Sequence, residues 1–212
     1  MVKYQRMAMT NPSAPNPSVE TILHGIIPYT FVDHTHADAV VIVTNTDNGE
    51  DRIKEIYGDS VLIVPYVMPG FLLAKTIYEM TRGIDWEKLE GMILLNHGVF
   101  TFNHDPKKSY EKMIELVSKA EDYIKDQGIG QIDDSSANKT DHLRLAQIRK
   151  QVSDLAGKPF LSHLNSSPAS TAFSNLKNID DVCSRGPLTP DHIIRTKRIP
   201  IVIHEDHEKD FA

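Results

Sequence analysis

The stretch Met92-Ile93-Leu94-Leu95-Asn96-His97-Gly98-Val99-Phe100-Thr101-Phe102 places a short polar turn between two apolar runs. Runs of about four such residues, bounded by turn-forming Asn and Gly, are typical of buried β-strands. We therefore expect a broken pair of strands, 92–95 and 99–102, around Asn96-His97-Gly98. The imidazole of His97 would then lie where a buried strand meets a loop.

A second histidine string, Asp33-His34-Thr35-His36, stands directly before the apolar run that begins at Ala39. Histidines at i and i+2 of an extended segment point the same way, because side chains alternate between the two faces of a strand. A third imidazole from a neighbouring strand, His97, would complete a three-nitrogen site with an open position. That is the ligand count of a catalytic zinc, and its presence would indicate a metal-dependent lyase. A lone His-x-His is weak evidence, since most of the ten histidines are expected to be surface or hydrogen-bonded residues.

The composition excludes several classes of protein. With 212 residues, 40% hydrophobic and 25% charged, the chain has the make-up of an ordinary globular protein. A net charge of -6 argues against a nucleic-acid partner. No apolar run approaches the roughly 18 residues of a membrane span, and the first residues lack the apolar core of a secretory signal. The single Cys183 fits a reducing cytoplasm and excludes a metal site built from cysteines. We expect a cytoplasmic protein without membrane or nucleic-acid partners.

Strands alternating with helices, followed by a helical tail, indicate an α/β fold. The proline-rich opening predicts an irregular arm over 1–16. We expect a core over 17–128 and, over 129–212, a helical, loop-rich extension of the same domain. The elements expected are a helix over 19–27 capped by Ser18, a buried strand over 39–44, a helix over 49–57, a strand over 60–66, a helix over 69–81, a helix from Asp105-Pro106 to Gly128, a polar joint over 131–139, a helix over 139–156, a helical turn over 178–184 and a helix start at Thr189-Pro190.

The ordered strings Pro17-Ser18-Val19-Glu20, His34-Thr35-His36 and Leu95-Asn96-His97-Gly98 resemble the class II aldolase/adducin family. Members pair an early Glu with a His-x-His and a later Asn-His-Gly, and the resemblance covers residues 17–125. The segment 185–196, Arg-Gly-Pro-Leu-Thr-Pro-Asp-His-Ile-Ile-Arg-Thr, is similar to the part that follows the aldolase core in certain two-enzyme sugar proteins. Those proteins join a rhamnulose-1-phosphate aldolase module to a short-chain dehydrogenase. The resemblance implies a central, mainly antiparallel sheet flanked by helices, with a helical C-terminal extension.

The resemblance also implies a site and a reaction. His34, His36 and His97 would hold Zn²⁺ or another divalent transition metal. The reaction would be retro-aldol cleavage of a sugar phosphate, such as rhamnulose 1-phosphate or a related ketose, through a metal-stabilised enediolate. Glu20 would be the general base, which needs a carboxyl with a raised pKa in a partly dry site. The alternative for Glu20 is an ordinary carboxylate at a helix N-terminus.

Other residues and partners are less closely defined. His192 and Arg195 either contact a charged substrate or bind backbone carbonyls. His24 is expected to be a satisfied buried histidine rather than a partner of Glu20. Asp33 would be a turn residue or would orient a ligand imidazole. Family members often place the site between subunits, so a homo-oligomer is expected.

Two departures from the family pattern leave other functions open. The glycine- and serine-rich loops that cradle a substrate phosphate ahead of Pro-Ser-x-Glu have no counterpart here, and no Gly-x-Gly-x-x-Gly indicates a dehydrogenase. We therefore expect either a piece of a longer protein or a trimmed relative with altered substrate handling. An epimerase or decarboxylase that uses the same enediolate chemistry is one alternative function. A non-catalytic, adducin-like binding module is the other.

Overall fold

The chain contains two compact units, Met1–Ile129 and Gly130–Ala212. The computed structural model describes residues 2–128, 140–204 and 210. Gly130–Ala212 has its own internal contacts, and the expectation that residues 129–212 extend the domain of the core stays a prediction. The polar joint expected over 131–139 lies outside the described residues.

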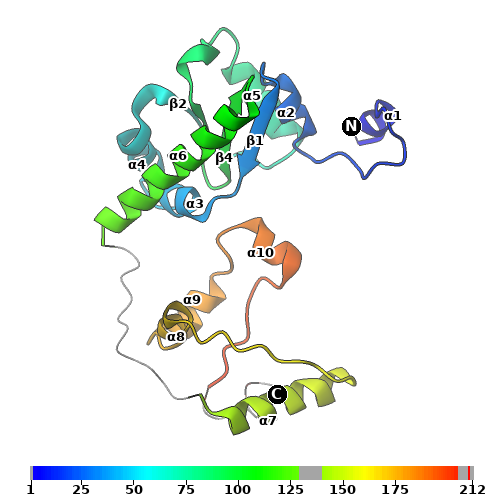
Figure 1. Cartoon of the computed structure of the whole chain (residues 1–212), viewed down its shortest axis with the longest axis vertical. Coiled ribbons are helices and arrows are strands. Elements are labelled where there is room, and N and C mark those ends of the chain that lie inside the picture. Colours follow the sequence, from blue (N-terminus) through cyan, green and yellow to red (C-terminus); the bar gives the residue numbers. More distant parts are fainter. Residues whose placement is uncertain (1, 129–139, 205–209, 211–212) are drawn as a thin grey trace. The chain divides into compact units, whose positions relative to one another are not determined.

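A four-stranded sheet forms the centre of the first unit, with the strand order β1-β4-β3-β2 (Figure 1). The strands are β1 (Phe31–Thr35), β2 (Val61–Val64), β3 (Gly91–Leu94) and β4 (Gly98–Asn103). β4 pairs antiparallel with both β1 and β3, whereas β2 and β3 are parallel. The expected α/β fold with a mainly antiparallel sheet is confirmed.

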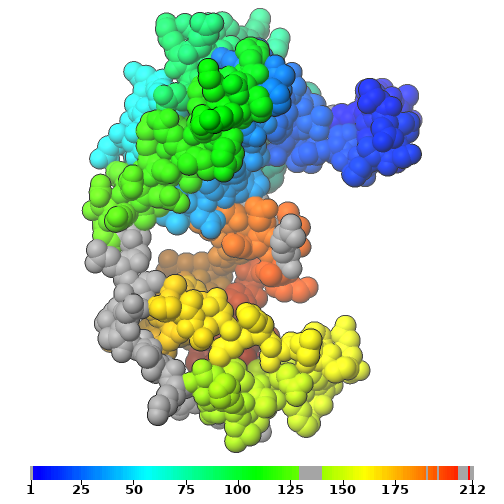
Figure 2. Space-filling model, viewed as in Figure 1, coloured from blue at the N-terminus to red at the C-terminus, as the bar shows by residue number. Residues whose placement is uncertain are grey.

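Helices cover both faces of this sheet and create two hydrophobic clusters. One cluster joins the sheet to α2 (Thr21–Ile26) and α5 (Phe71–Met80). The other joins it to α3 (Asp38–Thr44), α4 (Gly49–Tyr57) and α6 (Pro106–Asp126), whose outer side chains form part of the surface in Figure 2. Because neighbouring side chains on a strand alternate between faces, Met92 and Leu94 enter the first cluster while Ile93 enters the second. Burial on both faces explains why β3 reads as a continuous apolar run.

The segment 39–44 is a helix, α3, and not the strand that its β-branched residues predict. Its buried residues, Val40, Val41, Val43 and Thr44, follow the spacing of one helix face, and Ile42 between them is 38% exposed. The strand is instead β1, which ends just before His36. His34 therefore lies within a strand and His36 immediately after it.

Most other elements of the first unit lie within a few residues of their predicted bounds. α4 spans the predicted 49–57 and is followed by Gly58 with φ 58°. Asp105 caps α6 by accepting a hydrogen bond from the Lys107 N–H at 2.9 Å. Two differences concern the N-terminal region. The arm predicted to be irregular contains a short helix, α1 (Val2–Met7). α2 begins at Thr21, because the Ser18 hydroxyl accepts from the Glu20 N–H in the turn ahead of the helix.

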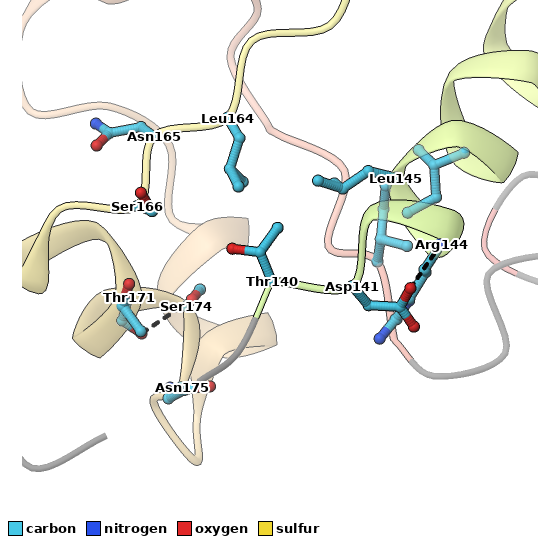
Figure 3. A pocket seen from close by; sticks show the side chains of 12 residues that line it. Thr140, Asp141, Arg144, Leu145, Leu164, Asn165, Ser166, Thr171, Ser174 and Asn175 are labelled. Atoms are coloured by element: carbon cyan, nitrogen blue, oxygen red, sulfur yellow. Dashed lines mark hydrogen bonds between the residues drawn. The ribbon is translucent and has the colours of Figure 1, made fainter. Parts of the chain in front are cut away.

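The second unit contains the helices α7 (His142–Ala156), α8 (Pro168–Ser174), α9 (Ile179–Ser184) and α10 (Pro190–Arg195). α8 was not predicted, although Ser167 caps it and Pro168 opens it. The start of α7, the segment 164–166 and α8 line a pocket of about 580 Å³ (Figure 3). Of the described residues in this unit, only Thr189 is fully buried. None of the helices described in either unit is long and apolar enough to cross a membrane.

Candidate metal centre

The pairing of β1 with β4 brings the two histidine strings together. His34 lies opposite Phe100 in the antiparallel register, so the residues that precede β4 lie beside those that follow His34. The ring centroid of His97 lies 5.2 Å from that of His34 and 5.1 Å from that of His36. The structure thus brings the three predicted imidazoles to one place.

Glu20 reaches the same place from the start of α2. Its Oε1 lies 3.0 Å from Nε2 of His97 and 3.4 Å from Nε2 of His34. Nε2 of His34 in turn lies 3.2 Å from Nε2 of His36. One ligand atom from each of the four residues lies within 4.8 Å of the others. Three imidazole nitrogens and one carboxylate oxygen form a donor set that suits zinc and neighbouring divalent metals.

The hydrogen bonding of His34 tests whether this donor set fits a cation. Nδ1 of His34 lies 3.0 Å from the carbonyl oxygen of Val99. A carbonyl oxygen only accepts, so Nδ1 donates, and a neutral His34 turns the lone pair of Nε2 toward Glu20 and His36. Lone pairs that converge at 3.2 to 3.4 Å need a proton or a cation among them. The arrangement therefore fits a bound metal ion, with the Val99 carbonyl orienting one ligand.

Burial and charge in this cluster affect Glu20 most. The side chain of His97 is 6% exposed and that of Glu20 16%. Without a metal ion, and with protons on the ring nitrogens that face the carboxylate, hydrogen bonds from His34 and His97 hold the pKa of the Glu20 carboxyl well below its ordinary value, although burial acts in the opposite direction. The raised pKa predicted from the sequence is therefore wrong for this arrangement. Glu20 is an ionised carboxylate that faces three imidazoles.

Two residues that the sequence reasoning gave no role shape the site. A Cβ at Gly98 would lie 2.4 Å from the Thr35 carbonyl oxygen and 3.1 and 3.2 Å from ring atoms of His34 and His36. Gly98 thus lets β4 and the two imidazoles approach closely. The ring of Phe100 stacks on His34, with centroids 3.9 Å apart and planes inclined by 11°.

Two neighbouring polar residues, His24 and Asp33, are not among the four clustered side chains. His24 is half-buried and meets Phe100 edge to face at 5.3 Å, and burial lowers the pKa of its imidazole. Asp33 precedes His34 on β1, so the two side chains point to opposite faces of the sheet. The Val99 carbonyl, rather than Asp33, orients His34.

The two predicted substrate residues belong to the second unit. His192 is exposed on α10, and its carbonyl accepts from the N–H and hydroxyl of Thr196 at 2.8 and 2.6 Å. Arg195 ends the same helix, and its side chain lies outside the described residues. Their contact with substrate stays a prediction.

A family model described as "Class II Aldolase and Adducin N-terminal domain" matches residues 2–124, more than half of the chain and all four clustered side chains. The chain belongs to this family. A second model, "Aldolase class II, second domain", matches residues 139–212 and agrees with the division into two units. Class II aldolases are generally lyases and typically use a divalent metal, which the four side chains are able to hold.

Two known proteins show how the similarity is distributed. A Bacillus subtilis (strain 168) protein named "Uncharacterized oxidoreductase YuxG" is 33% identical over 215 residues, which cover 96% of this chain. The chain spans 30% of the length of that relative. A solved N-terminal class II aldolase domain of a conserved protein from Thermoplasma acidophilum is 46% identical. The match covers 58% of this chain and 55% of the solved chain, with a TM-score of 0.51.

Proposed function

We propose that this chain is a metal-dependent aldolase module that cleaves a sugar phosphate, such as rhamnulose 1-phosphate or a related ketose, into two carbonyl compounds. One observation carries the proposal. In a chain of the class II aldolase family, a carboxylate and three imidazoles from separate segments present ligand atoms within 4.8 Å of one another. A scaffold without chemistry gains nothing from such a set, because converging lone pairs are costly without a cation.

His34, His36 and His97 would hold a divalent transition metal, with zinc the first candidate. When bound, that ion supplies a Lewis acid that polarises a carbonyl oxygen and stabilises the negative charge that develops as a carbon–carbon bond breaks. Glu20 would transfer the proton. In the cleavage direction the hydroxyl on the carbon that becomes the aldehyde loses a proton, and the other fragment gains one. The Glu20 carboxylate, 3.0 Å from Nε2 of His97, would accept the proton from the hydroxyl and return it to the other fragment.

The proposal extends to the surroundings of the module. We place His192 and Arg195 at the charged group of the substrate, within one chain or across a homo-oligomer in the cytoplasm. The Bacillus relative is named an oxidoreductase and is more than three times as long as the matched segment, which supports a two-enzyme arrangement. In that arrangement the aldolase module is joined to a dehydrogenase.

The test is a product and metal assay on the purified chain, loaded separately with Zn²⁺ and other divalent metals. We expect rhamnulose 1-phosphate or a related ketose phosphate to give two carbonyl fragments. His34→Ala and His97→Ala should lose both metal and cleavage. Glu20→Gln should keep the metal and lose at least about 10²-fold in turnover, as expected for a missing general base. His104→Ala is a matched control, because His104 forms a hydrogen bond with Thr30 at the end of the β1–β4 pair that lies away from the cluster.

Three results would contradict the proposal. A single isomer as product would indicate an epimerase. Equal metal content in the parent and both alanine variants would remove the site. Full activity in Glu20→Gln would assign the base to another residue.

A further inference from the structure

Hydrogen bonds link the turn that carries His97 to the C-terminal end of α3. The Thr44 hydroxyl accepts from the Asn96 N–H at 3.1 Å and donates to the Val41 carbonyl at 3.2 Å. The side-chain amide of Asn96 donates to the Thr44 carbonyl at 3.5 Å and to Oδ1 of Asn45. Thr44 is 4% exposed, whereas Asn96 is exposed. A buried hydroxyl therefore links the last turn of a helix to an exposed turn.

The backbone of Asn96 has an unusual conformation. Its φ of 56° lies in the left-handed region, which Asn tolerates better than most residues. The next N–H, that of His97, donates to the Leu94 carbonyl at 3.2 Å and closes the turn. Because Asn96 directly precedes His97, the conformation of Asn96 sets the direction in which the His97 side chain leaves the backbone.

The ring of His97 lacks the kind of hydrogen bond that orients the ring of His34. Its Nδ1 is buried and has no hydrogen-bond partner among the described residues, whereas Nδ1 of His34 donates to the Val99 carbonyl. Metal-binding histidines almost always donate their second ring N–H to a fixed acceptor, which orients the ring. For His97 the orientation comes instead from the turn, from packing and from the contact of Nε2 with Glu20.

We infer that Thr44 and Asn96 are positioning residues for His97, which hold its imidazole toward Glu20 and His34 through the backbone of the turn. This inference rests on the proposed function, because it assigns a role relative to the metal centre. Loss of the Thr44 hydroxyl releases the Asn96 N–H, which water can then satisfy, so the fold survives while the turn gains freedom. Outer contacts of metal ligands are typically worth about 10- to 100-fold in metal affinity.

The experiment compares variants of the full chain that differ by one hydrogen bond. Thr44→Val keeps the shape of the side chain and removes the hydroxyl, whereas Thr44→Ser keeps a hydroxyl. Asn96→Gly allows the left-handed backbone without the side-chain amide. Thr81→Val is the matched control, because the Thr81 hydroxyl donates to the Ile77 carbonyl at the end of α5 at 2.7 Å. The readouts are Zn²⁺ affinity by competition with a chelator and amide hydrogen exchange at residues 96 and 97 in the metal-free protein.

Thr44→Val should bind zinc about 10- to 100-fold more weakly and exchange the amide of Asn96 faster, with a smaller loss of affinity in Asn96→Gly. Thr44→Ser and Thr81→Val should match the parent in both readouts. Parent-like affinity in Thr44→Val overturns the inference, and so does an affinity loss that Thr44→Ser fails to restore.

The inference and the proposed function fail in different ways. If the parent binds zinc and the variants follow the predicted series but no ketose phosphate is cleaved, the function fails and the positioning role stands. If the parent binds no metal, the metal centre is wrong. Amide hydrogen exchange then decides whether Thr44 holds the turn. An unchanged exchange rate in Thr44→Val would overturn the role of Thr44 as well.

Discussion

At position 98, only a hydrogen atom leaves room for the residues around it. An added Cβ would lie 2.4 Å from the Thr35 carbonyl oxygen and near both ligand imidazoles, so something must shift. We expect Gly98→Ala to lose about 1 to 3 kcal/mol of unfolding free energy, as overpacked sites do. It should also lose zinc affinity, because the rings of His34 and His36 are among the groups displaced.

Gly25→Ala is the matched control for this change. Gly25 lies in α2, and a Cβ there meets nothing within 4 Å, so the variant should be as stable as the parent or up to about 1 kcal/mol more stable. Urea unfolding with and without zinc measures both effects. Equal behaviour of the two alanine variants would show that close approach at Gly98 is not required.

The four clustered side chains could be predicted from the sequence, but their supports could not. The period-two spacing of an extended segment and the family pattern predicted His34, His36 and His97. The carbonyl of Val99 is a backbone group that no residue pattern reveals. The pKa of Glu20 depends on where two ring nitrogens come to lie, so its direction was wrong in the sequence-based prediction. Asn ahead of His97 was the one available signal of a left-handed turn.

At the scale of elements, α3 shows why a short apolar run is ambiguous. Val40, Val41 and Val43 favour a strand by their branching. In α3 all three are buried, and Val40 and Val43 pack in one cluster with residues of α6 and β4. Tertiary packing outweighed the intrinsic preference, and a run of six residues is too short for periodicity to decide. α6 was predicted well because 21 residues repeat the helical period and a cap marks the start.

In the molecule as a whole, the four clustered side chains and the hydrophobic core belong to one unit. Both hydrophobic clusters and all four clustered side chains lie within Met1–Ile129. The second unit contains α7, the helix predicted over 139–156. In the structure Leu143 and Leu155 of α7 are 71% and 66% exposed. Amphipathic spacing in a sequence does not reveal what a helix packs against.

This distribution predicts how pieces of the chain behave. Residues 1–129 alone should unfold cooperatively and bind zinc as tightly as the full chain. Residues 130–212 alone should lack a cooperative transition, since their described part buries no large apolar side chain. Circular dichroism melts and zinc titrations of both pieces test this. A first piece that is unfolded, or that binds zinc more weakly than the full chain, would show that the second unit completes the site.

The most direct test of the metal centre is X-ray absorption spectroscopy of the zinc-loaded chain and of its His97→Ala variant. We expect three imidazole ligands in the parent, with Zn–N distances of about 2.0 to 2.1 Å, and no zinc bound at imidazoles in the variant. A parent spectrum without imidazole ligands, or the same ligand set in both proteins, would contradict this expectation.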